Sequence, residues 1–281
     1  MKRWMYTALI IAFSVLFLVS TAALVNYWWI SRQSQKTYDE LASLVEQHKP
    51  ISGSPVIGDT PDSASIPTQP PTEPPSPYVE VTKPNSSTTF MALREYAALY
   101  QLNPDFVGWL RFDDTRINYP VMHRPRSIDY YLHRDFYRKY DYHGCLYLRE
   151  QCNAFTPTDN ITIYGHNLKD GTMLTDLLQY REKSYWEEHR TFTFDTLTEH
   201  HTYEILSVFL TTATIGEGFE YHLFVDAADE AEFNAYVATC KELALYDTGV
   251  TAGYGDKLVT LSTCEYSQTN GRLVVVAKRI S

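Results

Sequence analysis

The hydrophobic pattern begins with one long apolar run. Between Arg3 and Arg32 no side chain is charged, and the run exceeds the roughly 20 residues that cross a bilayer as a helix. It predicts a cytoplasmic tip and a transmembrane helix over residues 1–30. A cleavable signal peptide is the alternative, because the small residues 20–22 resemble a cleavage site. Both interpretations export the remainder of the protein.

The orientation follows from what comes after the apolar run. Basic residues lie on both sides of it, so the positive-inside rule does not decide the topology. One apolar run followed by a long folded domain favours a single-pass protein with the N-terminus in the cytoplasm. We therefore expect the domain to be extracellular.

Residues 31–88 have the pattern of a polar stalk and linker. Residues 31–49 are polar and compatible with a helix, whereas residues 50–84 contain ten of the fourteen prolines. A polyproline-like chain rises about 3.1 Å per residue. The segment therefore predicts a spacer that reaches roughly 100 Å from the membrane when extended.

Residues 89–281 have the pattern of a domain built from short strands. Apolar positions at i, i+3, i+4 and i+7 from Leu93 predict an opening helix over residues 90–101, which ends before Pro104. Alternating segments then predict seven strands: VGWLRF, INYPVM, GCLYLR, NITIYGH, YEILSVFLTT, KLVTLSTC and RLVVVAKRI. So many short strands in fewer than 200 residues predict a closed or nearly closed β-barrel.

Two helical insertions interrupt these strands. One is predicted over residues 173–189, and the other, a longer helix with one apolar face, over residues 229–246. The fold class is therefore mainly β with helical additions. Hydrophobic residues make up 44% of the chain, enough to bury a core. The net charge of -10 and the absence of a basic run argue against a nucleic-acid partner.

Three residues at predicted strand ends have the chemistry of a cysteine enzyme. Cys264 ends the segment LVTLSTC before a polar loop, and its thiol needs a base or a cation to become a nucleophile. Arg272 opens the next strand, where a hairpin returns it to the same sheet end; its guanidinium can hold an oxyanion. His166 follows Gly165, a residue that permits unusual backbone conformations, and is the expected base.

Each of these residues also has a simpler interpretation. A lone cysteine in a strand is commonly a small buried hydrophobe, and this chain has nine histidines. The arginine on its own is compatible with a surface ion pair. The coincidence of all three at strand ends favours a catalytic site.

At these motifs the sequence resembles the class B sortases. YGHN precedes a helix, and TLSTC is followed eight residues later by the arginine of NGRLVVVAKRI. The segments NPDFVGWLRF, INYPVM and DYYLHRDF resemble the class B N-terminal region, so the resemblance covers roughly residues 90–281. It implies an eight-stranded sortase barrel with an N-terminal helix and a long helix inserted before the cysteine strand.

The resemblance also implies an activity. Cys264 would cleave a C-terminal sorting signal after threonine, and an amine of peptidoglycan, of its lipid-linked precursor or of a pilus-like polymer would release the acyl-enzyme. His166 would act as general acid and base, and Arg272 would steady the substrate and the oxyanion. The backbone N–H of Glu265 would complete the oxyanion hole. The expected partners are surface proteins with a sorting signal, and no cofactor is expected.

The remaining candidate residues predict less. The segment GCLYLREQC departs from the class B pattern. It contains Cys145 and Cys152, and in an oxidising exterior both a disulfide between them and two free thiols are compatible with the sequence. Cys240 lies on an apolar helix face and is predicted to be core. The pairs at 113–114 and 200–201 lack the spacing of a metal site, so we expect solvated loops and neither a metal nor calcium dependence.

Two other functions remain open at this point. An exported cysteine protease that only hydrolyses would use the same three residues, although papain-like enzymes place cysteine before histidine in the chain. A surface binding module with a non-catalytic trio is the second alternative. Replacing Cys264 with alanine would leave only the binding module functional.

Overall fold

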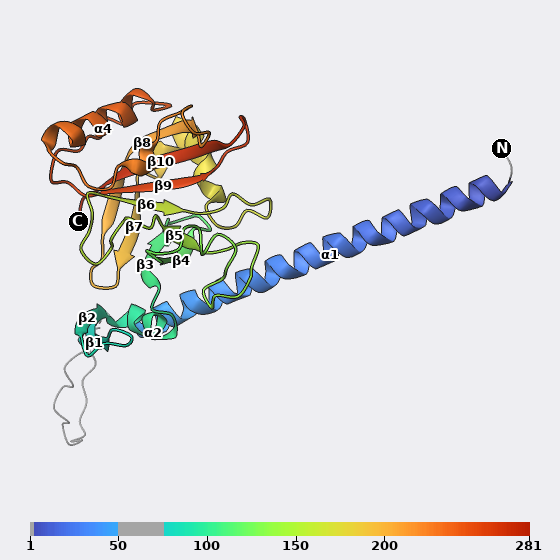
Figure 1. Cartoon of the computed structure of the whole chain (residues 1–281), viewed down its shortest axis with the longest axis horizontal. Helices are drawn as coiled ribbons and strands as arrows, with labels where there is room; N and C mark the ends of the chain where they lie inside the picture. The colour runs from blue at the N-terminus through green and yellow to red at the C-terminus, as the bar shows by residue number, and fades with distance from the viewer. Residues whose placement is uncertain (1–2, 50–75) are drawn as a thin grey trace, which may run out of the picture.

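A computed structural model describes residues 3–49 and 76–281. Figure 1 shows a barrel domain from which one long helix, α1 (Arg3–His48), projects. Most of the predicted proline-rich spacer, residues 50–75, lies outside the described residues.

The domain is a closed eight-stranded barrel with the strand order β10-β8-β7-β3-β4-β5-β6-β9. Its strands are β3 (Phe106–Arg111), β4 (Asn118–Met122), β5 (Leu146–Leu148), β6 (Asn160–Tyr164), β7 (Thr191–Thr196), β8 (Thr202–Thr212), β9 (Leu258–Cys264) and β10 (Gly271–Arg279). The pairs β4·β5 and β6·β9 are parallel, and the others are antiparallel. The predicted barrel is confirmed.

Alternation along β9 and β10 separates two cores. Val259 and Leu261, with the residues opposite them in β10, belong to the main core inside the barrel. Leu258 and Val274 point the other way and belong to a second core with the helix α4 (Glu230–Glu242). Successive side chains of a strand face opposite sides, so α4 covers the outer face of the strands that carry Cys264 and Arg272.

The structure corrects the predicted start of the domain. The opening helix is α2 (Arg94–Leu102), which begins four residues later than predicted because β2 (Thr89–Leu93) precedes it. β2 pairs with β1 (Tyr78–Thr82), in a stretch that the proline pattern had placed in the linker. Valine, threonine and tyrosine favour a strand there, and the neighbouring prolines obscured this signal.

The first helical insertion contains two short helices rather than the one that was predicted. It divides into a 3₁₀ helix, η1 (Thr175–Arg181), and α3 (Lys183–Glu188), and β7 follows it unpredicted. In β7 Phe192 and Phe194 are buried, whereas the alternating threonines are less so, which is the period of a strand. The second insertion is α4 as predicted, with Asp229 as its N-cap.

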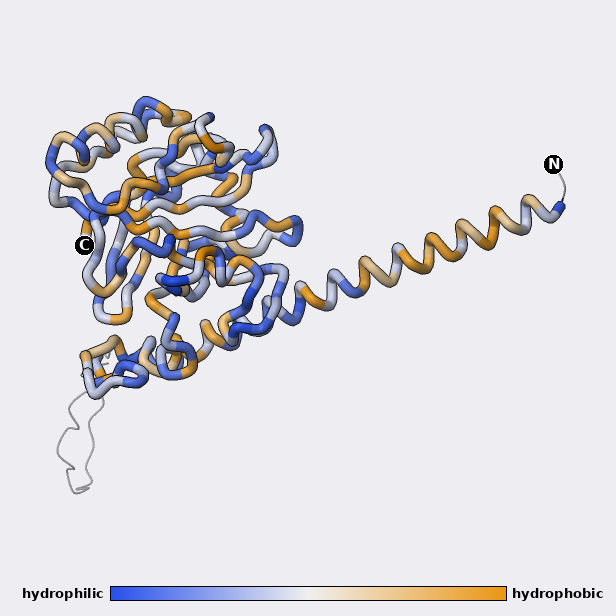
Figure 2. The backbone as a smooth tube through the Cα atoms, in the orientation of Figure 1, coloured by the Kyte–Doolittle hydropathy of each residue, from blue (hydrophilic) through white to orange (hydrophobic). Residues whose placement is uncertain are grey.

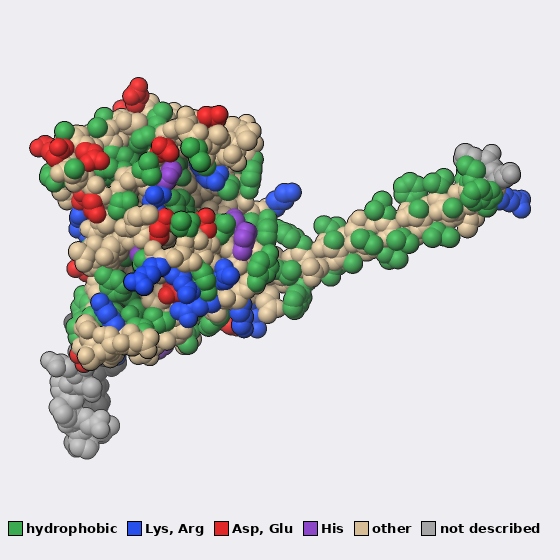
Figure 3. Space-filling view, in the orientation of Figure 1, with side chains coloured by type: hydrophobic (Ala, Val, Ile, Leu, Met, Phe, Trp, Pro, Cys, Tyr) green, Lys and Arg blue, Asp and Glu red, His purple; other side chains and the backbone are tan. Residues whose placement is uncertain are grey.

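The helix α1 has two different halves. Figure 2 shows that hydrophobic residues predominate along its N-terminal half, and Figure 3 shows apolar side chains on the visible face of that half, which is long and apolar enough to cross a membrane. In the second half Tyr38, Leu41 and Val45 are buried against the domain, where α1 contacts α2 and β4. The segment predicted as a polar stalk is therefore a continuous helix docked on the barrel.

Candidate active site

The strand register brings the three predicted residues to one end of the barrel. Cys264 of β9 lies directly opposite Arg272 of β10, and directly opposed residues share one face of a sheet. On the other side of β9, Tyr164 of the parallel strand β6 aligns with Ser262. His166 follows Tyr164 by two residues, and Cys264 follows Ser262 by two. Both residues therefore lie just beyond the last pair that β6 forms with β9.

Hydrogen bonds tie the histidine loop to the cysteine strand. The Gly165 N–H donates to the Ser262 carbonyl at 3.2 Å, and the Thr263 hydroxyl donates to the Gly165 carbonyl at 2.8 Å. The Asn167 side-chain amide donates to the Cys264 carbonyl at 2.9 Å. These bonds hold His166 beside the end of β9.

Gly165 is required for space rather than for backbone freedom. Its φ lies outside the positive region, contrary to the sequence interpretation. A Cβ at this position would lie 2.4 Å from a methyl carbon of Leu146 and 2.6 Å from Cγ of Leu174. The close packing of these two side chains therefore excludes any larger residue.

Cys264 differs from the other three cysteines in exposure. It is partly exposed, whereas Cys145, Cys152 and Cys240 are buried, and all four thiols are free. Burial raises the pKa of the Cys240 thiol to about 12 and that of the Cys152 thiol to about 11. The partly exposed thiol at the strand end is thus the one that a substrate or reagent can reach, and Cys240 is core as predicted.

His166 is held in one orientation by a carbonyl and two rings. Its Nε2 lies 2.8 Å from the Leu132 carbonyl oxygen, which can only accept a hydrogen bond, so Nε2 carries a proton. The rings of His133 and Tyr142 stack on it with centroids at 5.3 and 6.2 Å. Burial, aided by the charges of His133 and His143, lowers the pKa of His166. The neutral ring therefore leaves Nδ1 free to accept a proton.

Arg272 is available to a ligand. Its Nη1 donates to the backbone carbonyls of Asn270 and Gly271 at 3.2 and 2.9 Å, and within the described residues it forms no ion pair. The surface ion pair considered from the sequence is therefore absent here, which leaves the guanidinium free to meet a negative charge.

Glu265 has a different environment from the one expected. Its backbone N–H donates to the Gly271 carbonyl at 2.9 Å. This N–H can donate to an oxyanion only after that hydrogen bond breaks. The side chain is buried and pairs with Arg181 at 3.0 Å. Burial works against the charge of the Glu265 carboxylate, but hydrogen bonds from Ser267 and the charge of Arg181 outweigh it and lower the pKa.

The structure also corrects the interpretation of residues 200–201. His201 is buried, and His200 lies between the carboxylates of Glu95 and Asp195, at 3.2 and 2.9 Å. His201 is therefore structural rather than part of a solvated loop, whereas 57% of the His200 side chain is exposed, as expected. Asp113, in the other pair, is exposed as expected.

Sequence reasoning missed the residues that orient His166. Asn167 had a signal, because it follows the histidine directly in YGHN. His133 and Tyr142 lie between β4 and β5, where no periodic pattern marked them.

Comparison with known proteins agrees with this geometry. The family model of the sortase domain matches residues 110–280. Sortase B of Listeria monocytogenes is 32% identical over 190 residues, which cover 66% of this chain and 74% of the relative. Sortase B of Staphylococcus aureus is 29% identical over 188 residues, 66% of this chain and 75% of the relative.

Solved sortase B structures are also similar to this chain, and the alignment with one of them covers more of it. Sortase B from Bacillus anthracis in complex with AAEK1 aligns with a TM-score of 0.68 and 27% identity, covering 90% of this chain and 99% of that one. A Staphylococcus aureus sortase B structure aligns with a TM-score of 0.61 and 30% identity, covering 67% and 87%. The chain therefore belongs to the sortase family, within which its relatives are the class B enzymes, and it is a cysteine transpeptidase.

Proposed function

We propose that this sortase cleaves a C-terminal sorting signal after threonine through a thioacyl-enzyme on Cys264 and transfers the protein to an amine of the cell wall. The observation that carries the proposal is the register of three strands. It aligns a partly exposed thiol, a free guanidinium and a neutral imidazole at one barrel end.

The first half of the reaction forms the thioester. The Cys264 thiol loses its proton to Nδ1 of His166, and the sulfur attacks the carbonyl carbon of the threonine. The negative charge that develops on the carbonyl oxygen is met by Arg272, the residue paired with Cys264 across β9 and β10. The C–N bond then breaks, and the imidazolium of His166 returns its proton to the leaving amine.

The second half reverses these proton transfers. An acceptor amine attacks the thioester carbon and gives a proton to His166. The C–S bond breaks, the new amide forms, and the thiolate of Cys264 is reprotonated. Because each proton taken by His166 is returned, the cycle needs neither a metal nor a redox cofactor.

We further propose that α1 anchors the enzyme by a single span, with the N-terminus in the cytoplasm and the catalytic domain, residues 89–281, outside. The supporting observation is that the apolar run and the docked residues Tyr38, Leu41 and Val45 belong to one continuous helix. With this anchor the barrel would lie next to the membrane rather than at the end of an extended spacer.

The test is product analysis with the full chain in detergent. The enzyme is incubated with Asn-Pro-X-Thr-X and Ser-Pro-X-Thr-X peptides and an amine acceptor such as triglycine. Cleavage after threonine with amine-linked product supports transpeptidation, and Cys264→Ala abolishes it, whereas Cys240→Ala, at the buried thiol, retains it. Cleavage without joining would favour the hydrolase, and unchanged cleavage by Cys264→Ala would overturn the proposal.

A further inference from the structure

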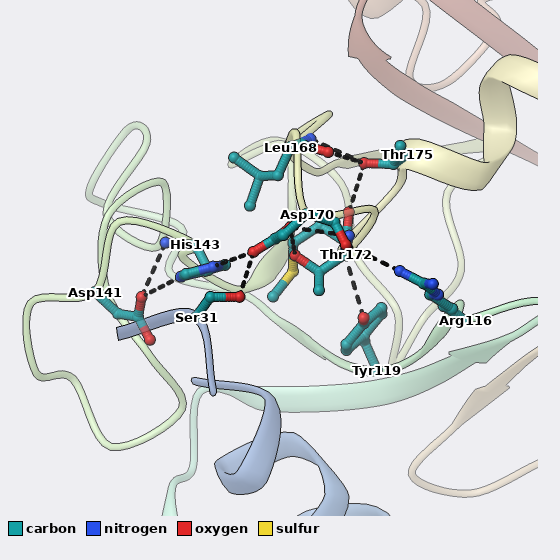
Figure 4. A network of polar contacts seen from close by, with 10 residues as sticks. Ser31, Arg116, Tyr119, Asp141, His143, Leu168, Asp170, Thr172 and Thr175 are labelled. Atoms are coloured by element: carbon teal, nitrogen blue, oxygen red, sulfur yellow. Dashed lines mark hydrogen bonds and ion pairs between the residues drawn. The ribbon is translucent and has the colours of Figure 1, made fainter. Parts of the chain in front are cut away.

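A buried histidine lies between two carboxylates next to the active site. Only 1% of the His143 side chain is exposed; its Nδ1 lies 2.9 Å from Asp141 and its Nε2 lies 2.8 Å from Asp170 (Figure 4). An ionised carboxylate can only accept hydrogen bonds, and a neutral imidazole donates from one nitrogen only. Two such contacts therefore require the imidazolium form.

The charges around the network agree with that assignment. Burial alone would lower the pKa of His143, but the hydrogen bonds that its ring donates to Asp141 and Asp170 outweigh burial and raise the pKa. Burial likewise opposes the charge of Asp170, yet hydrogen bonds from Ser31, Thr172 and His143 lower its pKa to about 2. The titratable groups facing the network are Asp141, Tyr142, Cys145, His166, Lys169 and Asp170 and, from α1, Tyr27 and Tyr38.

The helix α1 completes the network from the other side. The Ser31 hydroxyl donates to the same Asp170 oxygen at 2.6 Å, as Figure 4 shows. The Tyr38 hydroxyl donates to the Gly144 carbonyl and lies 3.3 Å from the Cys145 sulfur. One helix therefore holds both the segment around His143 and the loop that carries Asp170.

Both of these segments continue into the active site. Tyr142, next to His143, stacks on the ring of His166. Asp170 belongs to the loop that begins with His166 and Asn167, and that loop is bonded to the Cys264 carbonyl through Asn167. A shift of either segment would therefore move the general base relative to the nucleophile.

We propose that His143, as an imidazolium, is a positioning residue for the reaction: it joins α1 to the two segments that orient His166, so that the anchor helix forms part of the active-site support. The inference rests on the proposed role of His166. His143 acts through that residue and touches no reacting group.

The chain supplies a control histidine in a similar pairing but at the surface. His200 also lies between two carboxylates, Glu95 of α2 and Asp195 of β7; 57% of its side chain is exposed, and it contacts none of the residues that orient His166. If the ion pairs of His143 served stability alone, both His143→Gln and His200→Gln would leave kcat and the His166 resonances unchanged. If they position the site, only His143→Gln changes catalysis.

The experiment compares both variants and Ser31→Ala with the full chain in detergent. Peptide cleavage is measured as kcat and KM, the histidine rings are followed by NMR during a pH titration, and Cys264 is alkylated with iodoacetamide. We expect a titration midpoint of His143 above 6.5. For His143→Gln we expect shifted His166 resonances, slower alkylation and a kcat about tenfold lower at similar KM. His200→Gln should lower only the melting temperature.

The outcomes also separate this inference from the proposed function. The NMR and alkylation measurements need no substrate, so they remain decisive if no peptide is cleaved. A midpoint of His143 at or below 6.5, or unchanged His166 resonances and kcat in His143→Gln, would overturn the inference. If His143→Gln does not fold, Ser31→Ala decides: it keeps His143, and unchanged His166 resonances would contradict a role for α1.

Discussion

At the scale of the residue, the proposed mechanism depends on the protonation of His166, the proposed base for Cys264. Burial and the donor bond to Leu132 favour the neutral ring with the proton on Nε2. Nδ1 is then the atom that can take the thiol proton. A neutral imidazole at His166 in the resting enzyme is the consequence.

The pH dependence follows from this state. Because the pKa of His166 is lowered, the ring is neutral above pH 6.5 and gains its proton only in more acidic solution. We expect the cleavage rate to fall on the acid side below pH 6.5 and to give a bell-shaped profile. A rate that stays flat from about pH 5 to 10 would contradict proton sharing between His166 and Cys264.

Arg272 should depend on its geometry as well as on its charge. Lysine keeps the charge but loses the planar fork of donors, so we expect Arg272→Lys to lower kcat about 10²-fold or more. Arg279→Lys, in the same strand at its far end, is the control and should change kcat less than twofold. Equal kcat values for the two variants would remove Arg272 from the mechanism.

At the scale of the element, strand ends made the site readable from the sequence. β6, β9 and β10 are short alternating segments, and their ends place His166, Cys264 and Arg272 together. β1, β2 and β7 were missed because a proline-rich or helical pattern lay next to them. The positions of His133, Tyr142 and His143 depend on tertiary contacts of an aperiodic segment, and no local pattern encodes those.

The docked half of α1 is the element that was predicted least well from the sequence. Leu41 is fully buried in the main core, so Leu41→Ala should lower the free energy of unfolding by roughly 2–5 kcal/mol. The exposed Gln47, two turns further along the helix, provides the control, and Gln47→Ala should change stability by less than about 0.5 kcal/mol. Denaturant unfolding of the detergent-solubilised chain measures both, and equal stabilities would mean that α1 does not dock.

At the scale of the whole molecule, α1 joins the long apolar run to the barrel without a break. The apolar half is exposed on every side, and the second half contributes to the same core as the barrel. With the proposed single-span anchor, a continuous helix sets the distance between the membrane and the barrel. The sequence had placed that spacing in the proline-rich segment instead.

Stability should also depend on pH. The raised pKa of His143 means that its contribution is complete below pH 6.5 and is lost as the pH rises through the folded-state value. Asp195 and Glu95 raise the pKa of His200 to about 10, so its contribution to stability is also lost as the pH rises. We expect the denaturation midpoint to fall between pH 6 and about 10, and to fall less in His143→Gln. An equal fall of the denaturation midpoint in the unsubstituted protein and in His143→Gln would contradict an imidazolium at His143.

The most direct test of the central claim is the mass of the intact enzyme after mixing with a cleavable sorting-signal peptide in the absence of an amine. The account predicts an adduct equal to the peptide up to its threonine, bound as a thioester to Cys264, and its disappearance when the amine is added. An adduct on another residue, or cleavage by Cys264→Ala, would contradict the account.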